Sequence, residues 1–193
     1  MNSESPTPQI VMSKEDNVNT NECYLSTTIG DLLDMDRGSF MRRMRAGEAR
    51  QQQHPTSGTS QFKSWRDCFK VLKNTFGKFR SSELSQWREL QIEFERVLPN
   101  GRRPDVVIYS KRLVVVLEFK RMSNEFGGFL KQVRSYVKSL RASEAEGMKR
   151  KVKGVIIYTE MESAHDIGRI QKCSTDKLHE ALLHLLGGSP EKA

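Results

Sequence analysis

Two short runs of mostly apolar residues, 105–109 and 113–119, restrict the fold of this chain more than any other part of it. Both runs are rich in β-branched side chains and lack a polar residue at every second position, a pattern typical of strands that are covered on both faces. Only Ser110-Lys111-Arg112 separates them, so the two strands are expected to pair as a hairpin. The sequence therefore predicts a hairpin buried at the centre of a sheet.

Three charged residues flank this hairpin. Asp105 starts the first strand, and Glu118 and Lys120 end the second. Glu118 and Lys120 are two residues apart, so in a strand both side chains project from the same face. Pairing of the strands would bring Asp105 to that end as well. The hairpin therefore predicts two carboxylates and an ammonium group gathered at one end of a sheet.

Helices and further strands surround the hairpin. Apolar residues at helical spacing begin after Ser64, where Trp65 and Leu72 share one helical face. The predicted elements are a helix over 65–76, a strand over 90–98, the hairpin, a helix over 129–142 after Gly127-Gly128, a strand over 154–159 and a last helix over 178–186. This order of helix, three strands, helix, strand and helix indicates the α/β class.

The length of 193 residues is typical of one domain. Residues 1–22 are rich in Ser, Thr, Asn, Pro and Glu, which predicts a flexible N-terminal tail. Residues 23–60 predict a helical extension that ends in a polar loop. The folded domain is expected over residues 61–188, with a short C-terminal tail at 189–193.

The composition limits the partners and the compartment. The formal net charge is +8 and the pI is near 9.5, which favours nucleic acid as a partner, with a basic protein lacking a special partner as the alternative. No apolar run approaches the ~18 residues of a membrane span, and the first residues lack the pattern of a signal peptide. Cys23, Cys68 and Cys173 are far apart and predict reduced thiols. We therefore expect a cytoplasmic protein, or a nuclear one if the source is eukaryotic, without membrane insertion or secretion.

Asp105 and Glu118 suit a hard divalent cation, because Mg²⁺ is held by a few carboxylates and waters. The backbone carbonyl of Phe119 is a further candidate ligand. Such an ion would make a bound water more acidic and neutralise charge on a phosphate. Lys120 could orient that water or stabilise the phosphate in the transition state. The hairpin thus predicts a Mg²⁺ site, with Mn²⁺ as a substitute, suited to phosphodiester hydrolysis.

The residues around the hairpin resemble a known family. Pro104-Asp105, twelve residues and then Glu118-Phe119-Lys120 is similar to the signature of the PD-(D/E)xK nuclease superfamily. Gln132 and Tyr136 match the QxxxY helix motif of its RecB-like branch, and their i, i+4 spacing places them on one helix face. The resemblance implies a restriction-endonuclease-like αβββαβ core, with a central mixed sheet flanked by helices, as the nuclease-like domain over 61–188. It also implies that Gln132 and Tyr136 line the active site and contact nucleic acid.

The segment from Ser64 to Thr159 is most similar to the nuclease-like domain that precedes Schlafen-like and superfamily 1 helicase domains in microbial proteins. This chain contains no Walker A motif and no helicase domain. The resemblance therefore leaves two arrangements open, a stand-alone module or one that works with a helicase or other protein partner in trans. Many nucleases of this fold act as dimers, so a homodimer is compatible with the sequence.

The superfamily usually adds an acidic residue upstream of the aspartate. Glu95 is the first choice, because related domains carry a glutamate ten positions before that aspartate. Glu93 would share a strand face with Glu95, so the side to which Glu95 points stays open, and Glu89, on a preceding helix, is the alternative. The resemblance thus implies the catalytic set Asp105, Glu118, Lys120 and Glu95.

Basic residues accompany the predicted site. Arg102 and Arg103 lie just before the aspartate and are placed to meet the scissile phosphate. Arg134, Lys138 and Arg141 follow at helical spacing and form one stripe. Contacts of this kind to phosphates give affinity without sequence choice. A solvated helix face is the alternative explanation of the stripe.

The chain is therefore expected to be a Mg²⁺-dependent nuclease, a hydrolase acting on phosphodiester bonds, with DNA favoured over RNA. Two alternatives stay open. The same fold can form an inactive module that binds nucleic acid or a partner protein. It can also act as a ribonuclease on structured RNA, an activity that the resemblance to Schlafen-type proteins includes.

Overall fold

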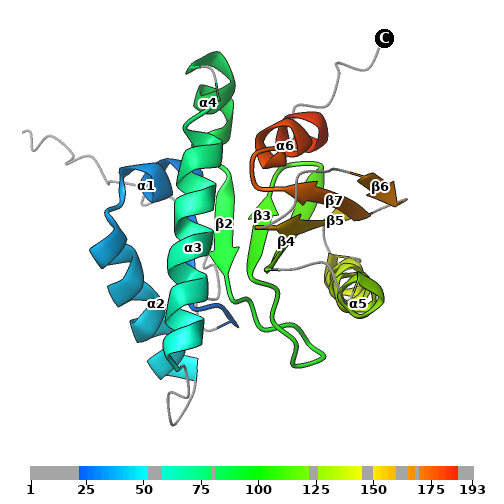
Figure 1. Ribbon diagram of the computed structural model, residues 1–193, viewed down its shortest axis with the longest axis horizontal. Coiled ribbons are helices and arrows are strands. Elements are labelled where there is room, and N and C mark those ends of the chain that lie inside the picture. The colour runs from blue at the N-terminus through cyan, green and yellow to red at the C-terminus, as the bar shows by residue number, and fades with distance from the viewer. Residues whose placement is uncertain are drawn as a thin grey trace, which may run out of the picture.

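The computed structural model describes residues 22–51, 58–79, 81–121, 126–144, 150–159, 165–167 and 170–186 (Figure 1). The two predicted tails, apart from Glu22, lie outside these residues, as do the centre of the polar loop and the Gly187-Gly188 pair expected after the last helix. Within the described residues the chain is a mixed α/β protein whose mixed sheet is flanked by helices. The predicted fold class is confirmed at this level.

The strands are β1 (Leu25–Thr28), β2 (Gln91–Phe94), β3 (Val106–Tyr109), β4 (Leu113–Lys120), β5 (Lys151–Tyr158), β6 (His165–Ile167) and β7 (Ile170–Ser174). The described strands form one seven-stranded sheet in the order β1-β2-β3-β4-β5-β7-β6. β1 to β4 pair antiparallel in sequence order, whereas β4, β5 and β7 run parallel and β6 is an antiparallel edge strand. The three parallel strands therefore end at the same edge of the sheet.

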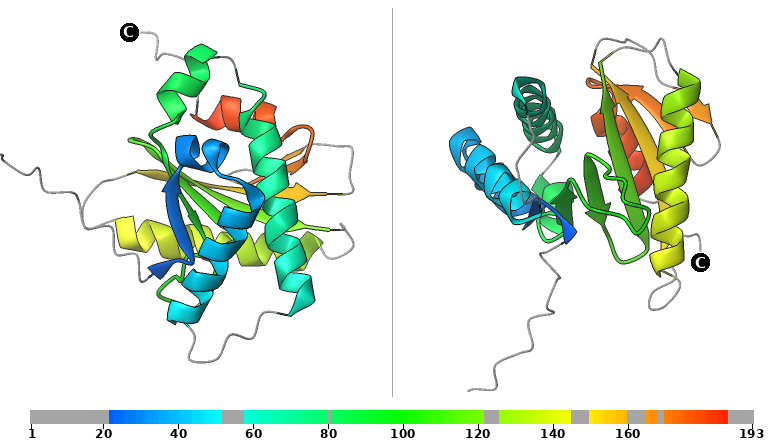
Figure 2. Two further views of the ribbon diagram at one scale, coloured as in Figure 1. Left: turned by 90° about the vertical axis from the view of Figure 1, so that its left-hand side faces the viewer. Right: turned by 90° about the horizontal axis from the view of Figure 1, so that it is seen from below.

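The helices are α1 (Ile29–Asp34), α2 (Arg37–Gln51), α3 (Thr59–Phe76), α4 (Ser81–Trp87), α5 (Phe126–Glu144) and α6 (Leu178–Leu186). α1, α2, α3 and α6 pack on one face of the sheet, and α5 packs on the other (Figure 2). The first face buries an aromatic-rich cluster that includes Phe40, Phe69 and Phe94. The second buries Val133 and Leu140 of α5 against β4 and β5. The sheet thus separates two buried clusters.

The central hairpin lies where the sequence predicts it. β3 and β4 pair with Val106 opposite Leu117, and both residues are fully buried. Ser110 closes the turn, since its backbone N–H and its hydroxyl donate to the carbonyl of Leu113 at 2.8 and 3.0 Å. Helices cover both faces of these strands, which explains their nearly unbroken apolar runs.

Two predicted helices start earlier than expected. α3 begins at Thr59 and not after Ser64. The sequence predicts a later start because the first turn of the helix is polar and shows no apolar periodicity. α5 begins at Phe126, so Gly127 and Gly128 lie in its first turn and do not precede it. A Cβ at either glycine would meet nothing within 4 Å, so packing does not require glycine there.

β2 is shorter than predicted and ends at Phe94 instead of Leu98. Glu95 follows with a φ of +51°, a left-handed conformation that is uncommon for residues other than glycine and that ends the ladder. β1, β6 and β7 are strands that the sequence analysis did not predict. β1 belongs to the segment 23–60, and its pairing of Leu25 with Phe94 makes that segment part of the sheet.

Among the described helices, none combines the length and the apolar character needed to cross a membrane.

The three cysteines lie in the core. Cys23, Cys68 and Cys173 are buried free thiols. Burial raises the pKa of each thiol, to about 12 for Cys23 and Cys173. Because the thiolate is the nucleophile, these cysteines are inert core residues.

Candidate active site

Asp105 and Glu118 lie side by side at the open end of the hairpin. The antiparallel register of β3 and β4 sets Asp105 opposite Glu118, so their side chains share one face of the sheet. Side chains alternate along β4, and Val116 belongs to the cluster under α5, so Glu118 and Lys120 also project toward α5. The hairpin thus brings the three charged side chains to one end of the sheet.

Hydrogen bonds hold this group in place. Oδ2 of Asp105 accepts the backbone N–H of Phe119 at 2.7 Å, and the backbone N–H of Asp105 donates to Oε2 of Glu118 at 3.4 Å. The Lys120 ammonium lies 2.7 Å from Oε1 of Glu118 and 4.8 Å from the centre of the Phe129 ring on α5. Within the described residues, Oδ1 of Asp105 accepts no hydrogen bond. That oxygen is therefore available to a ligand.

Glu95 reaches the same site from the other side of the sheet. Its side chain is 7% exposed, and its Oε1 accepts the Gln61 amide at 2.9 Å and the Trp65 indole N–H at 3.0 Å, both from α3. Its backbone N–H donates to the carbonyl of Asp105 at 3.1 Å. The positive φ allows this position, because strand alternation would direct Glu95 to the α5 side together with Glu93.

The two other upstream acids, Glu93 and Glu89, lie elsewhere. Oε2 of Glu93 accepts hydrogen bonds from Arg96 at 2.6 Å and from the Tyr109 hydroxyl at 2.9 Å. Glu89 is exposed in the turn that follows α4. Of these three acids, Glu95 is the one that lines a pocket with the hairpin carboxylates.

The pocket has a volume of about 580 Å³. Its walls come from α3, from the segment between β2 and β3, from the hairpin and from α5. The lining residues are Gln61, Glu95, Gly101, Arg102, Arg103, Asp105, Glu118, Gln132 and Tyr136. Lys120 is not among them but pairs with Glu118 beside the pocket. The structure therefore gathers most of the residues selected from the sequence at one place.

Gln132 and Tyr136 brace a wall of this pocket. The Tyr136 side chain is 1% exposed, and its hydroxyl donates to the carbonyl of Arg103 at 3.1 Å. The Gln132 amide donates to the Tyr136 hydroxyl oxygen at 2.5 Å. On the same helix, the Ser135 hydroxyl accepts the Asn100 side-chain amide at 3.2 Å. α5 therefore fixes the arginine-bearing segment between β2 and β3.

The side chains of the two arginines in that segment differ in how firmly they are held. The Arg103 guanidinium donates to the Tyr24 hydroxyl and lies 5.2 Å from the centre of the Tyr24 ring. Tyr24 in turn packs edge-on against Trp65 of α3, with ring centres 5.9 Å apart. Arg102 is exposed, and Gly101 before it has a φ of +72°, a turn conformation that favours glycine. One arginine is thus fixed in the wall, and the other stands at the rim.

The predicted basic stripe on α5 lies away from the pocket. Successive residues are about 100° apart around a helix, so Arg134 lies about 200° from Gln132, and Lys138 lies about 200° from Tyr136. Both basic side chains are exposed, and neither lines the pocket. They are too far around the helix to contact a phosphate held at Asp105.

Burial and mutual repulsion make the carboxylates hard to ionise. Burial and the charge of Asp105 raise the pKa of Glu118 to about 8, against the opposing effect of the Lys120 ammonium. Burial and Asp105 also raise the pKa of Glu95 to about 7, although the Trp65 hydrogen bond acts in the opposite direction. Burial raises the pKa of Asp105 as well. Negative charge in the pocket therefore carries a free-energy cost that a bound cation would offset.

The donor set fits Mg²⁺. Among the described residues, no group of three or more His, Cys, Asp or Glu side chains could hold a metal ion by itself. Mg²⁺ does not need such a cage, because it keeps several waters and binds one or two carboxylates together with substrate phosphates. Asp105 and Glu118 supply such a pair. The Phe119 carbonyl points toward the side of Asp105, since the N–H and C=O of one strand residue face the same neighbour.

These pKa shifts predict a metal-free protein that loses stability as the pH rises. A raised carboxylate pKa means that the folded state binds more protons than the unfolded state between about pH 4.5 and 8, so the unfolding free energy falls across that interval. We expect the Tm in EDTA to be lower at pH 8.5 than at pH 6 by on the order of 5 °C. Mg²⁺ should raise the Tm more at pH 8.5, because it binds the deprotonated carboxylates.

Thermal unfolding between pH 5.5 and 9, with and without Mg²⁺, measures this effect. Glu95→Gln and Glu118→Gln should each flatten the pH dependence of the Tm. The control Asp67→Asn removes an exposed carboxylate of α3 and should leave the dependence unchanged. An equal fall of Tm in the wild type and in both site variants would contradict the raised pKa values of these two groups.

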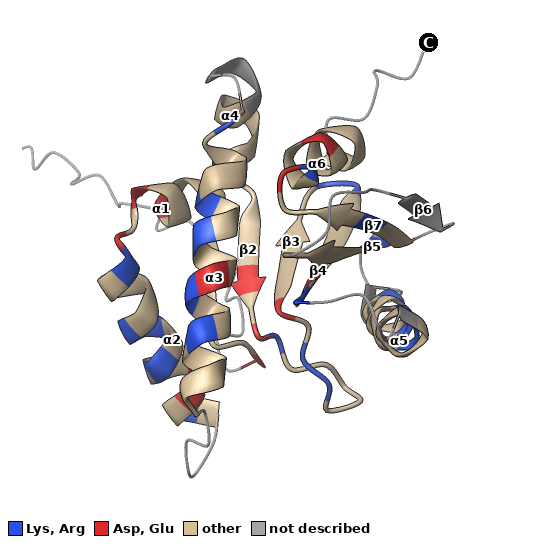
Figure 3. Cartoon of the chain, in the orientation of Figure 1, with Lys and Arg blue, Asp and Glu red and all other residues tan. Residues whose placement is uncertain are grey.

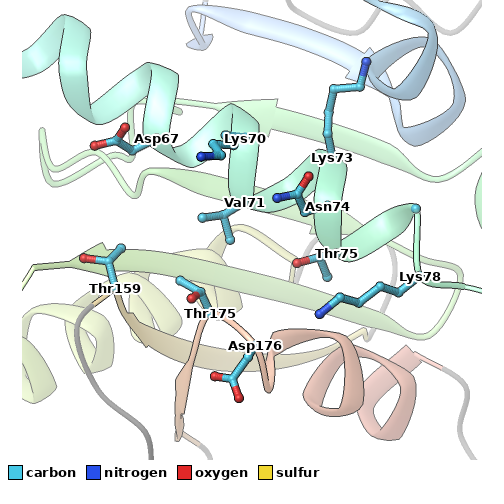
Figure 4. A pocket seen from close by; sticks show the side chains of 11 residues that line it. Asp67, Lys70, Val71, Lys73, Asn74, Thr75, Lys78, Thr159, Thr175 and Asp176 are labelled. Carbon is cyan, nitrogen blue, oxygen red and sulfur yellow. The ribbon is translucent and has the colours of Figure 1, made fainter.

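A larger pocket of about 770 Å³ lies between α3 and the residues that follow β5 and β7 (Figure 4). Its lining carries balanced charge, contributed by Lys70, Lys78, Asp67 and Asp176. Lys73 also lines it but turns away and donates to the carbonyl of Met35 at 2.9 Å. Asp67 comes from α3 and Asp176 from the residues after β7, so the two carboxylates lie on different walls and do not form a pair. The smaller pocket is therefore the candidate active site.

Two site residues, Gln61 and Trp65, do not stand out in the sequence. The apolar pattern places Trp65 on the buried face of its helix, which is correct, but its indole N–H also bonds to Glu95. Gln61 lies between the predicted loop, which ends at residue 60, and the helix expected from residue 65, although a helix that started earlier would place it on one face with Trp65, four residues later. Comparison with known proteins adds no assignment, because no protein-family model matches the chain and no curated protein matches it in sequence.

Proposed function

We propose that this protein is a metal-dependent nuclease of the PD-(D/E)xK superfamily, in its RecB-like branch, that hydrolyses phosphodiester bonds of DNA. The observation that carries the proposal is the pocket, which gathers Glu95 and Asp105 from the two ends of the β2–β3 connection and Glu118 from β4. Arg102 and Arg103 line the same pocket and supply positive charge for a phosphate. A site of three carboxylates repels an anionic substrate unless arginines and a cation compensate, so the two features support each other.

The order of the elements supports a restriction-endonuclease-like core. α3 and the short α4 precede the antiparallel strands β2, β3 and β4, and α5 then leads to β5, which pairs parallel to β4. This is the αβββαβ order that the resemblance implies. The carboxylates lie where β3 begins and β4 ends, and α5 carries Gln132 and Tyr136 beside them.

Asp105 and Glu118 would hold Mg²⁺, or Mn²⁺ in its place, together with the Phe119 carbonyl. The ion would supply an acidified water and neutralise charge on the phosphate. Asp105 keeps Oδ1 for this role, while the Phe119 N–H fixes Oδ2. Lys120, 2.7 Å from Glu118, can donate a hydrogen bond to a water or to a phosphate oxygen beside that carboxylate.

Glu95 and the arginines complete the proposed mechanism. A pKa raised to about 7 lets Glu95 accept a proton near neutral pH, which suits a general base. Arg103 is held by Tyr24 and can bind a phosphate oxygen without losing much conformational freedom. Arg102 is exposed at the rim and can follow the chain of the substrate.

Purified protein is expected to cleave DNA in the presence of Mg²⁺ or Mn²⁺ and to stop in EDTA. Lys120→Ala should lower the cleavage rate by about a hundredfold, the usual loss when a positioned proton donor is removed. The control Lys131→Ala removes an exposed lysine of α5 and should leave the rate unchanged. Gel assays with single-stranded DNA, double-stranded DNA and structured RNA measure these rates.

Three results would overturn the proposal. Cleavage that continues at the wild-type rate in Lys120→Ala would remove the proposed mechanism. Binding without cleavage would assign the protein instead as an inactive nuclease-fold module. Cleavage of structured RNA alone would make it a ribonuclease.

A further inference from the structure

α2 and α3 carry a large excess of basic residues. Residues 37–78 contain ten Lys and Arg but only two Asp and Glu, so this segment alone has a formal net charge of +8. One of the two acids, Glu48, is buried. Figure 3 shows the Lys and Arg of both helices distributed along the same outer layer. That layer therefore presents a strongly positive surface.

Five exposed residues form what we call the α2–α3 basic face. They are Arg42 and Arg45 on α2 and Lys63, Arg66 and Lys70 on α3. The three residues of α3 stand at i, i+3 and i+7, so they follow one side of that helix. The Arg45 guanidinium lies 4.6 Å from the centre of the Phe62 ring on α3, which joins the two rows.

Most charges of this face have no neutralising partner. Within the described residues, Lys63 and Arg66 form no ion pair and no hydrogen bond through their side chains. Arg42 donates to the Ser39 hydroxyl at 2.8 Å, and Ser39 in turn donates to the Asp36 carboxylate. Unneutralised cations on rigid helices create a positive potential that attracts polyanions.

The basic face shares α3 with two residues of the candidate active site but lies on another side of that helix. Gln61 lines the pocket, and Lys63 follows it by two residues on α3, about 200° further around the helix. Trp65, between Lys63 and Arg66, points inward and holds Glu95. The row from Lys63 to Lys70 covers about 10 Å of helix. The basic face is therefore a surface separate from the pocket, on the opposite side of α3 from Gln61.

We infer that the α2–α3 basic face binds the phosphate backbone of double-stranded nucleic acid. Cations on two neighbouring helices suit a charged backbone and offer no base readout. Surfaces for single strands interleave basic residues with exposed aromatic rings on which bases stack. Here the Phe62 ring is half-buried and covered by Arg45. The inference rests on the proposed function, since the substrate of a nuclease is a polyanion of this kind.

A pair of double substitutions tests this surface. Lys63→Ala with Arg66→Ala removes two charges from the basic face, and Arg134→Ala with Lys138→Ala removes two exposed charges from the far side of α5. Binding of full-length protein to a labelled 30-base-pair duplex is measured in EDTA over a range of KCl concentrations. The first pair should raise the Kd about tenfold or more and make the log–log salt dependence less steep by about 2. The second pair should leave the slope unchanged and the Kd nearly so.

Each other outcome counts against the inference. Equal weakening by both pairs would mean that net charge alone matters, and no weakening by the first pair would remove the surface. Wild-type binding to a single strand of equal length as tight as to the duplex would overturn the duplex assignment. Binding to vesicles containing phosphatidylserine, without duplex binding, would assign the face to a membrane.

Cleavage assays separate this inference from the proposed function. If the first pair weakens duplex binding while the wild type cleaves no substrate with Mg²⁺ or Mn²⁺, the basic face stands and the nuclease proposal fails. If the wild type cleaves DNA and the first pair binds the duplex as the wild type does, the nuclease proposal stands and the inference fails. Tm values of both variants confirm that the folds are intact.

Discussion

Replacement of Asp105 by Asn is expected to lower the rate of Mg²⁺-dependent DNA cleavage by about a thousandfold or more. Asn keeps an oxygen that can accept the N–H of Phe119, so the local structure should survive. It removes the negative charge of the proposed ligand, and stabilisation of a phosphate by a metal ion is worth several kcal/mol, with about 1.4 kcal/mol for each factor of ten. Single-turnover rates on a duplex substrate measure the effect.

Metal binding gives a second readout for the same variant. Mg²⁺ should raise the Tm of the wild type by mass action and should not raise that of Asp105→Asn. Asp67→Asn, which removes an exposed carboxylate of α3, should keep both the cleavage rate and the Tm shift. An Asp105→Asn protein that retains wild-type cleavage and a wild-type Tm shift would exclude Asp105 as a ligand.

Replacement of Gly47 by Ala is expected to lower the free energy of unfolding by about 3 kcal/mol, at the upper end of the usual cost of overpacking. α2 crosses the chain at Tyr24 so closely that a Cβ at position 47 would lie 1.8 Å from the Tyr24 carbonyl oxygen. The obstacle is backbone, which cannot rotate aside, so helix and strand must separate. Urea unfolding measures the loss. Because Tyr24 holds Arg103, cleavage by the surviving folded protein should also fall.

Gly128→Ala is the matched control. A Cβ there would meet nothing within 4 Å, and Gly128 lies in the first turn of α5. Alanine restricts the unfolded chain more than glycine does, so this variant should gain up to about 1 kcal/mol. A Gly47→Ala protein as stable as the wild type would show that α2 and β1 can move apart without cost.

Local chemistry is sufficient to predict the centre of this fold. The strands of the hairpin are short, β-branched and joined by a polar link, and the structure places them at Val106–Tyr109 and Leu113–Lys120, within one residue of the predicted bounds. The turn residues, and the apolar residues that burial on both faces requires, all lie within these few positions of the sequence. For this reason the pairing and its register follow from pattern alone.

The edges of the sheet could not be predicted in this way. β1 is Leu-Ser-Thr-Thr, with one buried side chain, and it is a strand because Leu25 pairs opposite Phe94. β7 has the polar pair Gln171 and Lys172 in its middle and becomes a strand beside β5. Strand propensity measures a fit to neighbours, so segments without a strong pattern are decided by tertiary pairing.

The candidate site also has one part that follows from the sequence and another part that does not. A short hairpin sets Asp105 opposite Glu118, so their proximity follows from spacing. The direction of Glu95 does not, because strand alternation predicts the α5 side, and the positive φ that turns it to Trp65 is not a preference of glutamate. Gln61 could not be predicted as a site residue for a related reason. It lies in the polar first turn of α3, which has no apolar periodicity to indicate a helix.

The placement of Glu95 has a consequence for which parts of the protein a bound ligand would hold together. Glu95 is bonded to α3, whose apolar face belongs to one buried cluster, while Asp105 and Glu118 lie on the α5 side with the other. A ligand that contacts all three carboxylates would connect the α3 layer to the α5 layer directly. Without such a ligand the two layers are connected through the sheet. Backbone amides of α3 and α5 should then become protected from hydrogen exchange together when the pocket is filled, although the two helices lie on opposite faces.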